Sequence, residues 1–154
     1  MFSTLLIFHS IVRWGILISL VVSLFFAYRG WLKNKPWTRF DNYCRIITVS
    51  FVHIQLIIGF WLYLISPIVD YFLNNFDEAL HITQARFFGM EHITMMVLAV
   101  SFITIGSSIA RRTKDSKKKF KMIAIWYTIA FIFIFTSIPW PFSPFTTRPY
   151  IRFF

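Results

Sequence analysis

The sequence has a single cysteine and only six acidic residues among its 154 positions. Cys44 cannot form an internal disulfide and belongs to no zinc-type cysteine spacing, so we interpret it as a small buried hydrophobic residue. The sequence also lacks any repeat of roughly 20 to 50 residues and any low-complexity linker. These absences exclude a disulfide scaffold and a repeat array, and they favour a single domain.

Apolar residues are present in large excess. They make up 57% of the chain, including 20 Phe and 6 Trp, and the mean hydropathy is +0.64. Soluble domains average roughly 45–50% apolar residues, and a water-facing surface could not cover so many large side chains without exposing wide patches. The composition therefore predicts an integral membrane protein.

Four segments are long and apolar enough to cross a bilayer, which takes about 20 residues. They are residues 3–28, 43–66, 87–110 and 122–138. Pro67 ends the second segment and Pro139 ends the fourth. Residues 67–86 are then an outer loop, and the aromatic, proline-rich residues 139–154 are a tail along the outer interface. We expect an all-α, four-transmembrane-helix bundle with up-down-up-down topology.

Lysine and arginine are concentrated in two of the connections, the stretches 29–45 and 111–121, and the net charge is +10. The positive-inside rule makes these two loops cytoplasmic, so both termini lie outside. Attraction of basic loops to anionic lipid accounts for "RRTKDSKKKFK" without a nucleic-acid partner. The expected partners are the lipid bilayer and other membrane protein subunits.

Ionisable residues inside the spans are the strongest functional indication, because they are costly in lipid and normally face the bundle interior. They are His9, Arg13, His53, Glu91 and His92; the fourth span has none.

His9 and His92 are expected at the same depth, roughly 8 to 9 Å below the outer boundary at about 1.5 Å per residue. Spans one and three are diagonal in a simple bundle, so the two imidazoles would face each other across its axis. This arrangement suits axial ligation of haem iron. Gly89 and Met96 would form part of the pocket, Gly89 by removing bulk beside a porphyrin edge. The alternative is two unrelated histidines satisfied by helix-to-helix hydrogen bonds.

The other three ionisable residues each have two interpretations. Arg13 either neutralises a haem propionate or Glu91, or it is a structural arginine paired with the backbone. Glu91 is either an acid stabilised by the helix dipole, which we favour, or a proton acceptor beside a quinol or a partner of a histidine. His53, near the midplane, is either a hydrogen-bonding core residue or an alternative ligand.

The stretches "LLIFHSIVRW", "FVHIQLIIGFWLYLISP", "ARFFGMEHITMMVLAV" and "SIPWPF" resemble small four-span bacterial membrane proteins that are loosely labelled cytochrome b-like. More distantly, the chain is similar to four-helix b-type cytochrome modules and to one half of haem A synthase. The resemblance implies one b-type haem held by His9 and His92, with His53 as a third family-like histidine, in the bacterial inner membrane. Relative to these proteins, we expect no histidine pair for a second haem and no counterpart of the other half of haem A synthase.

The expected function is electron transfer between a quinol pool and a partner at the outer face, with haem b and a quinone as cofactors. The alternative is a non-catalytic accessory subunit of a larger membrane complex without its own cofactor. A third hypothesis is a metal site made from His9, His92 and Glu91 with His53.

Overall fold

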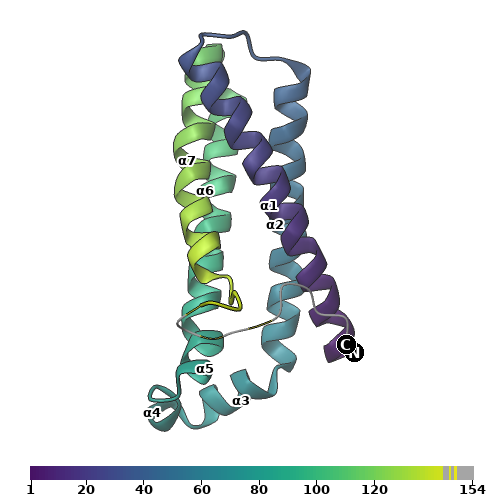
Figure 1. Ribbon diagram of the computed structural model, residues 1–154, viewed down its shortest axis with the longest axis vertical. Helices are drawn as coiled ribbons and strands as arrows, with labels where there is room; N and C mark the ends of the chain where they lie inside the picture. Colours follow the sequence, from purple (N-terminus) through teal and green to yellow (C-terminus); the bar gives the residue numbers. More distant parts are fainter. Residues whose placement is uncertain (144–145, 147, 149–154) are drawn as a thin grey trace.

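The structure is a computed structural model that describes residues 1–143, 146 and 148, and within these residues helices are the only regular secondary structure. Four helical segments are long and apolar enough to cross a membrane, and Figure 1 shows them side by side. They are α1 (Phe2–Leu32), α2 (Arg39–Ile65), a continuous segment Thr83–Arg112, and α7 (Ser116–Ser137). The prediction of an all-helical chain with four such helices is confirmed.

The third long segment changes its helical winding partway along. It begins as α5 (Thr83–Arg86), passes through the π-helix η1 (Phe87–Glu91) and continues as α6 (His92–Arg112). A π-helix has wider turns than an α-helix, and such turns inside α-helices are frequent at functional sites. The wider turn also changes the direction in which residues before and after it point.

The segment expected as an outer loop contains short helices. α3 (Pro67–Asn74) begins with a proline at its first position, where the missing N–H costs nothing. α4 (Phe76–Ala79) and α5 follow it. These helices lie together at one end of the bundle (Figure 1).

The long helices pack in a ring. α1 packs against α2 and α7, and α6 packs against the same two helices, which places α1 and α6 across the bundle from each other. Leu20, Ile103 and Tyr127 form part of the core and have no exposed surface. A Cβ atom at Gly106 would collide with the side chain of Trp126. Gly106 therefore allows α6 and α7 to approach closely.

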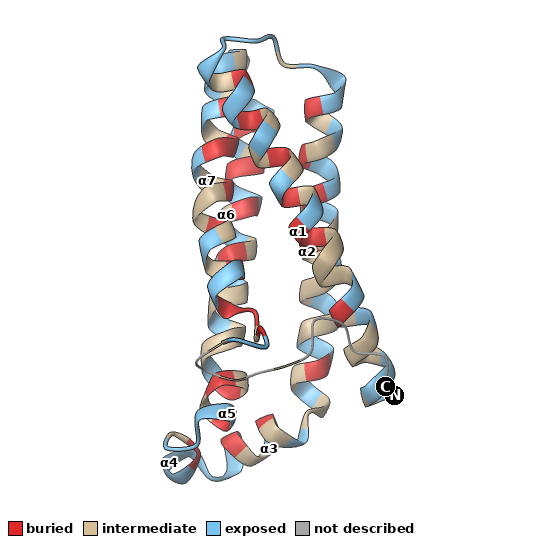
Figure 2. Cartoon of the chain, in the orientation of Figure 1, coloured by how far each residue is buried: buried red, intermediate tan, exposed pale blue. Residues whose placement is uncertain are grey.

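The outside of the bundle is covered by large apolar side chains. Ile18, Phe25, Ile57 and Leu64 are 64%, 61%, 67% and 81% exposed, and Figure 2 shows how exposed and intermediate positions alternate with buried ones along each helix. In water such a surface would be an aggregation hazard. A surface of this kind suits a protein surrounded by lipid.

Side-chain caps fix the connections at the end opposite α3. Thr38 and Asp41 form a reciprocal capping box at the start of α2. The carboxylate of Asp115 accepts a hydrogen bond from the N–H of Lys118 at 2.7 Å and caps α7. The other end of the bundle carries the cavity described below. Most of the tail expected along the outer interface, namely residues 144, 145, 147 and 149–154, lies outside the described residues.

Candidate functional site

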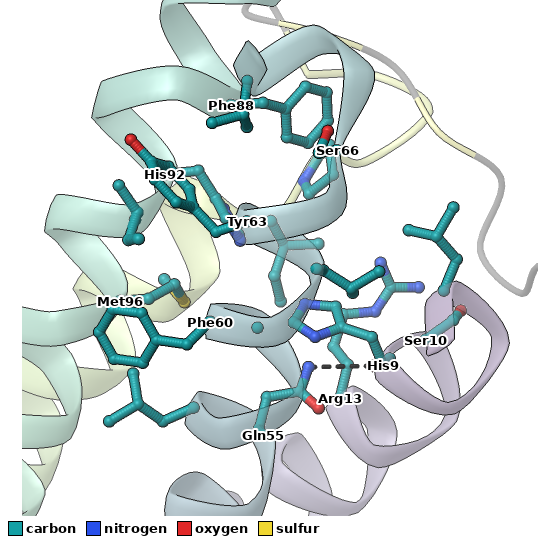
Figure 3. Close-up of a pocket in the computed structure, with 18 of the residues that line it drawn as sticks. His9, Ser10, Arg13, Gln55, Phe60, Tyr63, Ser66, Phe88, His92 and Met96 are labelled. Carbon is teal, nitrogen blue, oxygen red and sulfur yellow. Dashed lines mark hydrogen bonds between the residues drawn. The ribbon is translucent and has the colours of Figure 1, made fainter. Parts of the chain in front are cut away.

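A cavity of about 460 Å³ lies among α1, α2, α3, α6 and α7. Its size is within the roughly 300–1,000 Å³ that is usual for cofactor and small-molecule sites. Most of its wall is apolar, and Figure 3 shows polar side chains entering from several helices. The polar groups that matter below are those of His9, Arg13, Gln55, Tyr63, His92 and Arg148.

His9 and His92 meet in this cavity. The centroids of the two imidazole rings are 6.4 Å apart, and the ring planes make an angle of 64°. Figure 3 shows His9 entering from α1 and His92 from the opposite wall on α6. The two histidines, which the sequence places at one depth, thus come from opposite sides of the bundle, and their rings lie close to each other in the cavity.

The ring of His92 is oriented by the backbone of α7. Its Nδ1 atom lies 2.8 Å from the carbonyl oxygen of Ser137. Because a carbonyl oxygen can only accept, Nδ1 carries the hydrogen and Nε2 keeps a lone pair. The rings of Phe87 and Phe88 flank the imidazole at centroid distances of 5.5 and 6.2 Å. His92 therefore offers Nε2 as a ligand.

The ring of His9 has no such restraint. Its Nδ1 atom is buried and has no hydrogen-bond partner among the described residues. Gly59 lies beside the ring, with space for a Cβ atom 3.4 Å from His9 Cε1. A buried imidazole nitrogen without a partner is costly and calls for an explanation, such as an ion or ligand that the nitrogen binds.

Gln55 supports His9 and presents a second polar atom. Its Nε2 donates to the carbonyl oxygen of His9 at 2.9 Å, while its Oε1 is buried without a partner in the described structure. Gln55 is not among the site residues that the ionisable groups of the sequence indicate. An amide inside a transmembrane segment was the signal that could have identified it.

Two arginines give the cavity a positive character. The guanidinium of Arg13 lies 5.7 Å from the ring centre of Trp14 and 5.8 Å from that of Trp140. Arg148 also lines the cavity and lies over Phe88 at 5.3 Å. Among the described lining residues there is no Asp or Glu. The described wall of the cavity thus combines two guanidinium groups with apolar side chains.

Met96 lines the cavity as the sequence analysis expects, whereas Gly89 does not. A Cβ atom at Gly89 would collide with the ring of Phe72 on α3, so this glycine makes room for α3 and not for a porphyrin edge. The π-helix η1, which regular helical spacing cannot predict, changes the direction in which Gly89 faces. The carbonyl oxygen of Gly89 accepts a hydrogen bond from the Tyr63 hydroxyl at 2.8 Å.

Glu91 and His53 are engaged outside the cavity. The carboxylate of Glu91 pairs with Arg86 Nε at 2.7 Å, and not with Arg13. His53 Nε2 lies 3.0 Å from the hydroxyl of Thr104, which is the hydrogen-bonding alternative for this residue.

The hypothesis of a metal site with three or four ligands is wrong for the residues described. They contain no group of three or more His, Cys, Asp and Glu side chains that could hold a metal ion. Glu91 and His53 have the separate partners given above, which leaves His9 and His92 as a pair.

Comparison with known proteins identified no relative of this chain. The chain matches no protein-family model, no curated protein and no solved structure.

Proposed function

We propose that the protein is a membrane-embedded b-type haem protein in which His9 and His92 are the two axial ligands of one haem iron. The observation that carries this proposal is the pair of imidazoles, 6.4 Å apart between centroids, inside an apolar cavity of about 460 Å³. Two imidazoles bound to one metal at roughly 2 Å have centroids roughly 6 Å apart, since each centroid lies about 1 Å behind its bonding nitrogen.

The donor set fits a haem better than it fits a bare metal ion. Two neutral nitrogens, with no Asp or Glu among the described lining residues, form a poor site for a free divalent cation, which normally has three or more protein ligands. A porphyrin would supply four nitrogen ligands of its own and would need apolar walls, which the cavity provides. The buried Nδ1 of His9 lacks a partner among the described residues, which agrees with a ring that turns one nitrogen or the other toward an occupant.

The cationic side chains suit the remaining chemistry of a haem. Arg13 and Arg148 line the cavity and would neutralise carboxylate groups at its edge, since guanidinium groups bind carboxylates well. Met96 contributes a polarizable wall. These residues would hold and orient the macrocycle and exclude water from it.

When bound, the haem would supply a reversible one-electron centre. His9 and His92 would both hold the haem through its iron, which leaves neither imidazole to act on a substrate. Two protein ligands therefore favour electron transfer over chemistry at the metal.

The proposed topology places the cavity near the outer face. The basic stretches 29–45 and 111–121 flank the end of the bundle opposite α3, and the positive-inside rule assigns that end to the cytoplasm. An up-down-up-down chain with both termini outside follows. In the bacterial inner membrane, a haem at this depth would transfer electrons between a quinol pool and a partner at the outer face. The protein would act as a small subunit of a larger complex.

The test is an optical spectrum of the purified protein, oxidised and reduced. A Soret band with reduced b-type bands is expected, and either His9→Ala or His92→Ala should abolish or strongly alter it. His53→Ala is the matched control, because His53 is a histidine of the same bundle that bonds Thr104 outside the cavity. A preparation without a Soret band, or one whose spectrum survives both cavity variants, would refute the proposal and leave the accessory subunit as the better account.

A further inference from the structure

The carbonyl oxygen that orients His92 lies at the last residue of α7. Ser137 ends the helix, and Ile138 adopts an extended conformation with φ −73° and ψ 129°. Ile138 precedes Pro139, and the residue before a proline disfavours the helical conformation because of a clash with the proline ring. The helix therefore ends where the sequence "SIPWPF" dictates.

Pro139 and Pro141 leave two carbonyl groups of α7 without a helical partner. In an α-helix the N–H of a residue donates to the carbonyl oxygen four positions earlier. The carbonyl of Phe135 would need the N–H of residue 139, and that of Ser137 would need the N–H of residue 141. Both positions are proline, which has no N–H.

Two side chains take up these carbonyl groups. The indole Nε1 of Trp140 donates to the carbonyl oxygen of Phe135 at 2.8 Å, and Nδ1 of His92 donates to that of Ser137 at 2.8 Å. The first bond holds the Trp140 ring in contact with Arg13. The second bond fixes the imidazole of His92.

We propose that Pro139 and Pro141 are positioning residues for His92: Pro139 ends α7 at Ser137, and Pro141 withholds the N–H that would bond the Ser137 carbonyl, so that this carbonyl accepts from Nδ1–H and Nε2 carries the lone pair toward His9. The inference rests on the proposed function in one respect, since Nε2 would be the iron ligand. A histidine ligand that donates its other N–H to a backbone carbonyl is fixed in tautomer and direction and is a stronger electron donor.

The first test measures the tautomer of His92 without any haem. The full chain, prepared from haem-starved cells with ¹⁵N-labelled histidine, is studied by NMR in detergent micelles, and the His92 signals are identified by their loss in His92→Gln. We expect the Nδ1–H tautomer at His92. An Nε2–H tautomer at His92 in the unaltered chain would overturn the inference.

The second test removes the prolines. In P139A/P141A the helix can continue and the Ser137 carbonyl can accept from the new N–H of residue 141, so His92 should shift toward the Nε2–H tautomer. Ser137→Ala is one control, because it keeps the carbonyl, and Pro36→Ala in the distant α1–α2 connection is another. If the double variant does not fold, Pro141→Ala alone takes its place. A folded variant that keeps the Nδ1–H tautomer would overturn the inference.

The tautomer of His92 also distinguishes a positioning role of the two prolines from a purely structural role. Trp140 and Ser143 close a turn around Pro141 through a 2.9 Å hydrogen bond between their backbones. Loss of that turn alone would lower stability without changing the His92 tautomer.

A final measurement separates the inference from the proposed function. In haem-loaded protein, P139A/P141A should raise the reduction potential while Ser137→Ala does not, because the axial ligand loses its carbonyl partner. If the tautomer of His92 changed and the reduction potential did not, the expected influence of the Ser137 carbonyl on the potential of the haem would be contradicted. A chain that shows the expected tautomers but binds no haem would support the positioning by the prolines and refute the haem proposal alone.

Discussion

Substitution of Gly89 by alanine distinguishes two explanations of this glycine. In the structure a Cβ atom at Gly89 would meet the Cβ, Cγ and Cδ1 atoms of Phe72, which are close to the backbone of α3 and cannot easily move. Overpacking of this kind costs about 1–3 kcal/mol. Replacing a helical glycine by alanine gains up to about 1 kcal/mol from helix propensity. The overpacking should dominate.

The expected net loss for Gly89→Ala is about 1–2 kcal/mol, which lowers the ratio of folded to unfolded protein roughly 5- to 30-fold. The assay is reversible unfolding of the haem-free protein in mixed micelles, followed by circular dichroism. Gly59→Ala is the matched control, since its Cβ would meet only His9 at an ordinary contact distance of 3.4 Å. This control should be neutral or slightly stabilising.

The refuting result is also specific. If Gly89→Ala left the stability of the haem-free protein unchanged and reduced only haem binding, Gly89 would face the cofactor as the sequence predicts. That result would contradict the contact between Phe72 of α3 and Gly89 of η1.

Two other hydrogen bonds give measurable predictions. Tyr63→Phe removes the hydroxyl that donates to the Gly89 carbonyl at 2.8 Å, so unfolding in micelles should show a loss of about 0.5–1.5 kcal/mol; equal stability would mean that this bond does not hold η1. Ser107→Ala removes the acceptor of Arg45 Nη1 at 2.6 Å, and because Arg45 is only 9% exposed the loss should be larger, about 1.5–3 kcal/mol. A smaller loss for Ser107→Ala than for Tyr63→Phe would contradict the view that the buried charge depends on this hydroxyl.

The sequence predicts the long helices well because their signals are local. Runs of apolar residues bounded by charges and prolines define each span, and the cost of polar groups in lipid identifies His9 and His92 as inward-facing. Helical rise alone predicts their equal depth. The adjacency of the two rings additionally requires that α1 and α6 be diagonal, which the packing of the helices provides.

The rest of the site depends on features that periodicity does not contain. The π-helix η1 changes the direction of Gly89, so the expected contact with a porphyrin edge is replaced by a contact with Phe72. The partner of Glu91 is Arg86, five residues earlier, a separation that lies beyond ordinary helical spacing. Gln55 was passed over because an uncharged amide gives a weaker signal than an ionisable group.

The hydrogen bond between His92 and Ser137 depends on a feature that is visible in the sequence. The "SIPWPF" sequence marks the end of the fourth helix in both the prediction and the structure. Which carbonyl groups two prolines leave free follows from the i to i−4 rule alone. Which side chain would reach them requires the packing of α6 against α7.

The most direct test of the central claim is the low-temperature EPR spectrum of the oxidised protein with its haem content. The account predicts one haem per chain with a low-spin ferric signal typical of two histidine ligands, converted to high spin or lost in His9→Ala and in His92→Ala but retained in His53→Ala. A high-spin signal in the unaltered protein, or a low-spin signal that survives removal of either cavity histidine, would contradict axial ligation by His9 and His92.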